Sequence, residues 1–134
     1  MEYNAITMPS ILMDKAEAFG VRITNAYRYL TKEKQETIIS KQLYRSGTSI
    51  SANISEAQYA SSRADFINKM HIALKEANES KNWINLLHKG QFIDKSTYES
   101  IYNDVVEIIK LLTSSINTAK NNGKNNDNDK ENPC

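Results

Sequence analysis

Apolar residues recur at alternating steps of four and three over three long segments of this chain, and this spacing constrains the fold more than any other feature. In an α-helix, such spacing keeps the apolar side chains on one face. The three series are Leu12, Ala16, Phe19, Ile23, Ala26 and Leu30; Phe66, Met70, Ala73, Ala77, Ser80, Ile84 and Leu87; and Tyr98, Ile101, Val105, Ile108 and Leu112. They predict three long amphipathic helices.

Helix start and stop signals flank these series. The first follows Pro-Ser at residues 9–10, a typical start. Ser62 and Asp65 form a capping-box pair before the second series, and Gly90 follows its end. Asp94 can cap the third helix. The short segments between the series are therefore expected to be turns.

The segment from about Glu36 to Tyr59 fits two patterns. As a helix, it would place two polar residues in a seam made of Ile39, Leu43, Ser46, Ile50, Asn53 and Ala57. The alternation of Ile50, Ala52 and Ile54 is also typical of a strand. We favour a helix, because one isolated strand among long helices has nothing to pair with.

Four helices joined by short connections near residues 31–36, 58–62 and 90–94 predict an all-α fold, an antiparallel up-down-up-down four-helix bundle. The expected organisation is an N-terminal extension at residues 1–9, the bundle at residues 10–119, and a tail at residues 120–134. The tail is polar and rich in asparagine, so it is predicted to be disordered.

Composition narrows the class of protein further. A chain of 134 residues with 40% apolar content fits a single core. Seventeen Lys and Arg against 16 Asp and Glu give +1; residues 121–134 hold two lysines and three acids, which leaves +2 for residues 1–120. This surplus does not by itself indicate nucleic-acid binding.

Cysteine usage and hydropathy suggest a location. Cys134 is the only cysteine, so no disulfide framework within the chain and no thiolate metal cluster are expected. The N-terminus lacks the pattern of a secretory signal, and charges interrupt every long apolar stretch. We therefore expect a cytoplasmic protein that does not span a membrane.

The second helix carries a more specific pattern. It supplies seven residues of a Gln-x-x-Arg-x-x-x-Ser-Ile-x-x-Asn-Ile-x-Glu-Gly motif, namely Gln42, Arg45, Ser49, Ile50, Asn53, Ile54 and Glu56. With these residues the chain resembles, over residues 10–118, the four-helix bundle family of 23S rRNA intervening-sequence proteins, a relative of the accessory variability determinant of diversity-generating retroelements. The motif's final glycine is Ala57 here. Asp65-Phe66, Ile72-Ala73-Leu74 and Glu79 of the third helix also resemble this family.

The resemblance implies a ring-like homo-oligomer, a pentamer. It implies no settled activity, because members encoded within ribosomal RNA genes have no assigned reaction. The retroelement relatives are basic barrels that bind a reverse transcriptase and nucleic acid. At +2 for residues 1–120, this chain is less basic than that group leads one to expect.

The polar side chains of the motif can share one flank of the second helix. Polar groups that are buried must find partners. We hypothesise that Asn53, Arg45 and Glu56 bond with Glu79 and its neighbours on the third helix, and so fix helix register or a subunit contact. The predicted buried polar network is Gln42, Arg45, Ser49, Asn53, Glu56 and Glu79. Direct contact with a ligand is the alternative. Gly20 and Gly47, inside predicted helices, suggest close helix approach.

Two further sets of residues are candidates for contacts with partners. The candidate nucleic-acid contacts are Arg45, Arg63, Lys69, Lys75, Lys81 and Lys89. The alternative for these cations is an ordinary solvated helix face. The candidate subunit-interface aromatics are Trp83, Tyr27, Tyr44 and Tyr102, which otherwise complete the core.

No pattern of catalytic residues is evident. No Glu lies three residues before His71 or His88, so the sequence lacks the pairs that hold a di-metal centre in four-helix bundles. No cofactor motif or phosphate loop is present. We expect a non-enzymatic, self-assembling scaffold or binding module with nucleic acid, RNA or DNA, as its first candidate partner. The alternative is a homo-oligomer that recruits a protein such as a reverse transcriptase without binding nucleic acid itself.

Overall fold

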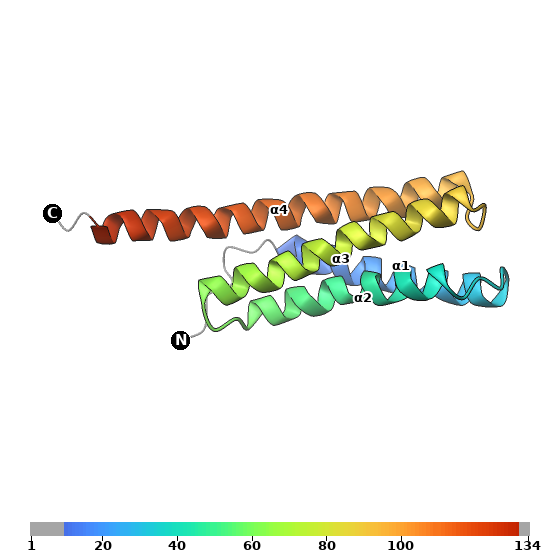
Figure 1. The fold of residues 1–134 in the computed structure, drawn as a ribbon, viewed down its shortest axis with the longest axis horizontal. Helices are drawn as coiled ribbons and strands as arrows, with labels where there is room; N and C mark the ends of the chain where they lie inside the picture. The colour runs from blue at the N-terminus through green and yellow to red at the C-terminus, as the bar shows by residue number, and fades with distance from the viewer. Residues whose placement is uncertain (1–9, 132–134) are drawn as a thin grey trace.

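The computed structural model describes residues 10–131, which form four α-helices: α1 (Ser10–Lys32), α2 (Ile39–Gln58), α3 (Arg63–Lys89) and α4 (Lys95–Glu131). Successive helices run in opposite directions, as the colour gradient in Figure 1 shows. The predicted all-α four-helix bundle is confirmed. The predictions about residues 1–9 and about Cys134 lie outside the described residues.

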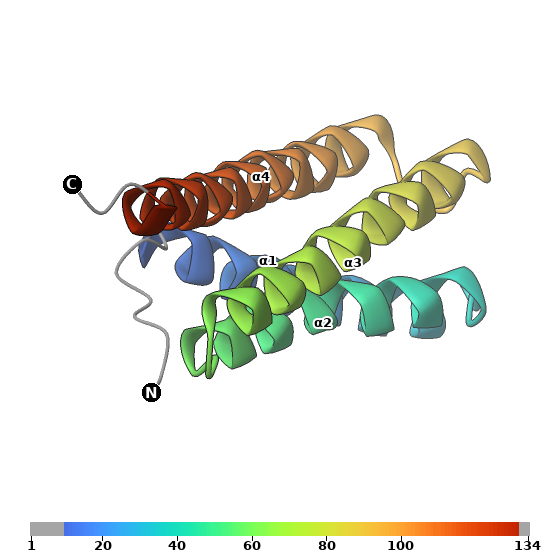
Figure 2. The same ribbon diagram turned by 60° about the vertical axis from the view of Figure 1, so that its left-hand side comes forward.

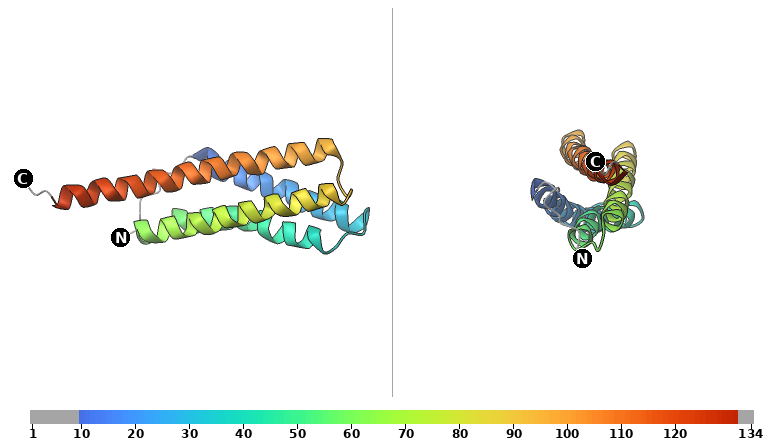
Figure 3. Two further views of the ribbon diagram at one scale, coloured as in Figure 1. Left: turned by 45° about the horizontal axis from the view of Figure 1, so that its top comes forward. Right: turned by 90° about the vertical axis from the view of Figure 1, so that its left-hand side faces the viewer.

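The helices follow one another around the bundle axis. α2 and α3 share the most extensive contact, α1 packs on α2, and α4 packs on α3. The view along the axis in Figure 3 shows α1 and α4 as neighbours that close the bundle. Their contact is the sparsest of the four, and ion pairs bridge it, including one between Lys15 and Glu107 at 2.9 Å.

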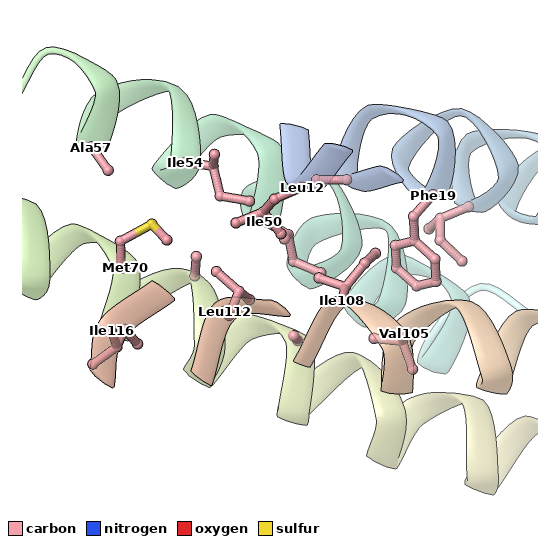
Figure 4. Packing of buried hydrophobic residues seen from close by; sticks show 14 of the residues in the cluster. Leu12, Phe19, Ile50, Ile54, Ala57, Met70, Val105, Ile108, Leu112 and Ile116 are labelled. Atoms are coloured by element: carbon pink, nitrogen blue, oxygen red, sulfur yellow. The ribbon is translucent and has the colours of Figure 1, made fainter. Parts of the chain in front are cut away.

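The predicted apolar series form the core. Side chains from all four helices converge there, as Figure 4 shows for Leu12, Ile50, Met70 and Leu112. Among the three series, only Ala26 and Tyr98 are partly exposed. Burying one stripe from each helix supplies the main driving force for folding, since about 25 cal/mol is gained for each Å² of apolar surface removed from water.

The ambiguous segment is a helix, as favoured above, and its seam differs from the predicted one at two positions, where Ser40 is buried rather than Ile39 and Ile54 rather than Asn53. Leu43, Ser46, Ile50, Ile54 and Ala57 are buried, whereas Asn53 is only partly buried. The seam follows Ile54 rather than Asn53 because rotating α2 slightly buries an aliphatic side chain in place of an amide.

The start of α2 is capped by a residue that sequence reasoning missed. The carboxylate of Glu36 accepts hydrogen bonds from the backbone N–H groups of Ile38, Ile39 and Ser40 at 2.9, 2.7 and 2.7 Å. Glu36 is only 8% exposed. Burial raises its pKa, but the three backbone N–H bonds outweigh that effect, so the pKa of Glu36 lies below its usual value.

The other helix ends largely follow the predicted signals. The Ser62 hydroxyl accepts a hydrogen bond from the Asp65 N–H at 3.0 Å, while the Asp65 carboxylate bonds the N–H of Ser61 rather than that of Ser62. α3 ends at Lys89, and Gln91 takes the left-handed conformation, with φ 68°, in the turn that follows. Asp94 caps α4 by accepting the Thr97 N–H at 2.7 Å.

α4 continues beyond the predicted end of the bundle. Residues 120–131 extend the helix where the sequence predicted a disordered tail from residue 120. Ala119 is buried, and a Cβ added at Gly123 would lie 3.0 Å from Cδ of Arg63. Small residues at these two positions keep α4 close to the start of α3, so packing extends at least to Gly123 although no large apolar residue marks it.

Candidate functional site

The polar motif residues of α2 lie toward the outside of the bundle, whereas the motif residues Ile50 and Ile54 are buried in the core. Gln42, Arg45 and Glu56 are exposed, and Ser49 and Asn53 are partly buried. The network expected to be buried is therefore a surface feature on the flank of α2 that adjoins α3. These polar side chains face outward because Leu43, Ser46 and Ile50 take the inward positions of the helix.

Part of this flank bonds across to α3. Arg45 pairs with Glu79 and, at 3.2 Å, with Glu76. The Trp83 indole N–H donates to the same Glu79 carboxylate at 3.3 Å. The hydrogen bond to Glu79 and the two carboxylate charges raise the pKa of Arg45, so the guanidinium stays charged. One arginine thus joins two acidic residues and is fixed beside an aromatic side chain.

Three other polar residues of the motif form their bonds away from Glu79. Glu56 pairs with Lys69 of α3 at 3.0 Å, and this contact raises the pKa of Lys69. The Asn53 amide instead donates to the Ser49 carbonyl at 2.8 Å, and the Ser49 hydroxyl donates to the Arg45 carbonyl at 2.6 Å. Arg45 therefore bonds Glu79 as hypothesised, whereas Glu56 bonds α3 at Lys69, far along the helix from Glu79, and Asn53 bonds within α2.

The candidate nucleic-acid contacts do not gather into one patch on a single bundle. Arg45 and Lys69 are engaged in the ion pairs just described. Lys75 and Lys89 are exposed, and Arg63 and Lys81 are partly buried. Because each residue turns an α-helix by about 100°, Lys75 and Lys89 share an outward face of α3 while Lys69 and Lys81 each lie about 120° from Lys75.

The candidate interface aromatics lie at the rim of the core. Tyr27 and Tyr44 stack across α1 and α2 with ring centroids 4.7 Å apart, and Tyr44 remains 37% exposed. Trp83 and Tyr102 pack against the core while staying partly exposed. Tyr102 also lies 5.3 Å from Tyr98, centroid to centroid.

Two cavities at one end of the bundle bring together residues that sequence reasoning did not connect with one another. One, of about 410 Å³, lies between α1 and the start of α4 and is lined by Arg22, Asn25, Ala26, Tyr29, Leu30, Ile93, Asp94, Thr97 and Ile101. The other, of about 380 Å³, is lined by Tyr29, Lys34, His88, Gln91, Phe92, Ile93 and Asp94. These residues meet only through the turns, so no sequence spacing could have revealed them.

Among the side chains that the structure describes, no three from His, Cys, Asp or Glu lie together as metal ligands would. His88 stacks on Tyr98 at 4.1 Å between ring centroids. None of the described helices has the length and apolar character needed to cross a bilayer.

Comparison with known proteins identifies the family. The profile described as 23S rRNA-intervening sequence protein matches residues 10–114. The chain is also similar to a crystal structure of a protein of unknown function from the S23 ribosomal protein family of Bacteroides thetaiotaomicron. Identity to it is 55%, the match covers 80% of this chain and 96% of that one, and the TM-score is 0.79. No curated protein matches the chain. With its four-helix bundle and its α2 motif, the chain belongs to the 23S rRNA-intervening sequence protein family.

Proposed function

We propose that this protein is a non-enzymatic bundle that assembles with copies of itself and serves as a scaffold or binding module. The observation that carries the proposal is the outward position of the polar residues of the α2 motif. Arg45 is fixed by Glu76 and Glu79, and Trp83 is hydrogen bonded beside it. Exposed ion pairs by themselves contribute little to stability, so we infer that this arrangement serves binding.

The residue types on this flank favour a protein interface. Arginine and large aromatic residues are enriched at interface centres and supply much of the binding energy. Arg45 and Trp83 on this flank belong to these types, as does the Tyr27–Tyr44 stack between α1 and α2. The proposed partner is a second copy of the chain, and the family resemblance supports a ring, proposed to be a pentamer. The proposal sets this assembly in the cytoplasm, whose reducing conditions suit a chain with one cysteine.

The oligomeric state tests this proposal. Native mass spectrometry and light scattering should give a discrete oligomer for the wild-type protein. Arg45→Glu adds a third carboxylate beside Glu76 and Glu79 and should shift the mass toward smaller species. Arg28→Ala is the matched control, because Arg28 is an exposed arginine of α1 whose hydrogen bond to Asn25 is long, at 3.5 Å. A wild-type monomer at micromolar concentration would overturn the proposal.

Nucleic acid, RNA before DNA, is the first partner class proposed for the assembly. The family description and the similar structure both refer to ribosomal components, which supports RNA. Lys75 and Lys89 share an exposed face, and a ring would repeat that face around its rim. Fluorescence anisotropy with structured RNA and duplex DNA at two salt concentrations tests this, since phosphate contacts weaken steeply with salt. No binding at low salt would favour the alternative, a scaffold that recruits a protein such as a reverse transcriptase.

A further inference from the structure

The two cavities lie at the end of the bundle where α1 ends and α4 begins, which is on the right of Figure 1. Both are lined by the same aromatic side chain. Tyr29 borders both and is 48% exposed, and Ile93 and Asp94 also line both. Volumes of about 410 and 380 Å³ fall within the range of small-molecule sites. We call these two adjacent cavities, which share Tyr29, Ile93 and Asp94, the double cavity.

The first cavity offers hydrogen-bonding groups above an apolar floor. Arg22 is fixed by Asp104 and by a 3.0 Å hydrogen bond to the Ser100 hydroxyl. Asn25 adds an amide that can donate and accept, and Leu30 and Ile101 are apolar. This combination suits a flat, largely neutral ring with donors and acceptors along its edge.

The second cavity has a different character. Lys34 supplies a cation, and Phe92 and His88 supply further ring surface. Asp94 lies between the two cavities, where one of its oxygens already accepts the N–H of Thr97 at the start of α4. Asp94 therefore acts on both cavities alike. Because Arg22 of the first cavity already pairs with Asp104, the anionic part of a ligand belongs beside Lys34 in the second cavity.

We propose that the double cavity binds an unpaired nucleotide of an RNA strand, with its base in the first cavity against Tyr29 and its phosphate beside Lys34. This inference rests on the nucleic-acid part of the proposed function. Proteins read unpaired RNA bases by stacking them on aromatic side chains and bonding their edges. A carboxylate only accepts hydrogen bonds, and the Watson–Crick edge of guanine presents two adjacent donors, so Asp94 favours guanine.

Binding of short RNA tests the site. Fluorescence anisotropy at low salt would compare a labelled single-stranded RNA containing guanines with one in which adenines replace them. Tyr29→Ala should weaken binding of the guanine strand by about tenfold or more, since stacking of one base has that order of effect. Tyr29→Phe keeps the ring and should bind like the wild type. Tyr59→Ala is the matched control, because Tyr59 is 73% exposed and lines neither cavity.

A second variant tests the base preference. Asp94→Asn retains an oxygen to cap α4, because asparagine is also a good N-cap residue, but it replaces an acceptor with a donor. This variant should bind the guanine strand no more tightly than the adenine strand. Circular dichroism would establish that each variant keeps its helices.

The outcomes separate this inference from the proposed function. If the wild-type protein binds the strand and Tyr29→Ala binds it equally well, the site is overturned while nucleic-acid binding stands. If no single-stranded RNA binds but structured RNA does, the site is likewise overturned. Guanosine monophosphate binding as tightly as the strand would overturn RNA as the source of the nucleotide. A wild-type monomer would contradict self-assembly without touching the Tyr29 result.

Discussion

The side-chain oxygens of Ser46 on α2 and Ser80 on α3 lie 2.7 Å apart in the buried interface between these helices. Ser80 is also 2.9 Å from the carbonyl oxygen of Glu76, to which it donates. Ser46 then donates to Ser80, so both hydroxyls are satisfied. Two serines in an otherwise apolar seam are therefore tolerated because each supplies what the other needs.

This pair should show strong coupling when mutated. Ser80→Ala removes the close partner of Ser46 and leaves it only the Leu43 carbonyl at 3.4 Å, so it should cost about 1 kcal/mol. The double variant Ser46→Ala, Ser80→Ala should cost less than the two single changes combined, because no polar group is then left without a partner. Urea unfolding at one protein concentration measures the cycle. Additive costs would contradict the coupling.

Two helical glycines should respond in opposite directions to alanine. A Cβ at Gly47 would lie 3.0 to 3.3 Å from three Ile23 atoms, so Gly47→Ala should force α1 and α2 apart and cost about 1 to 3 kcal/mol. A Cβ at Gly20 would meet nothing within 4 Å, so Gly20→Ala should stabilise the helix by up to about 1 kcal/mol. Thermal unfolding followed at 222 nm compares the two. Destabilisation by both changes would mean that Gly20 is also a close-packing position.

The Glu36 cap predicts a pH-dependent contribution to stability. Because its pKa is lower in the folded than in the unfolded state, Glu36 stabilises the fold above the unfolded value of about 4.5, and this contribution is lost as pH falls through the folded pKa. Glu36→Gln should cost about 1 to 2 kcal/mol at pH 7 and progressively less in acid. Urea unfolding between pH 3 and 7 measures this.

Glu33→Gln is the control for Glu36. Glu33 is an exposed glutamate close to the same turn, and its removal should change stability little at any pH. Equal pH profiles for the two variants would show that the Glu36 carboxylate does not cap α2 in solution.

Neighbouring positions on α2 should differ sharply in their effect on stability. Asn53 bonds the Ser49 carbonyl of its own helix, so Asn53→Leu should change the unfolding free energy by less than about 0.5 kcal/mol. Ile54 is fully buried, and Ile54→Ala should cost about 2 to 5 kcal/mol. Chemical denaturation with light scattering follows stability and assembly together. A large loss for Asn53→Leu would restore the register role first hypothesised for this amide.

The sequence by itself determined the helices and the core. A step of four and three fixes which side of a helix is apolar, and this local periodicity correctly predicted the buried faces of α1, α3 and α4. The Ser62 and Asp94 caps were equally local and equally readable. The helical state of α2 could also be predicted, because a single strand among helices would have had nothing to pair with.

Only the tertiary structure decided what those helices present to their surroundings. The side of α2 that carries Arg45 is set by a small rotation that buries Ile54 in preference to Asn53, a choice between neighbours that periodicity leaves open. The cap from Glu36 depends on the path of a turn. The cavities around Tyr29 join residues of α1 to the turn before α4, far apart in sequence. Burial of apolar surface is encoded residue by residue, whereas surfaces and cavities arise from how packed helices meet, and that geometry exists only in the folded chain.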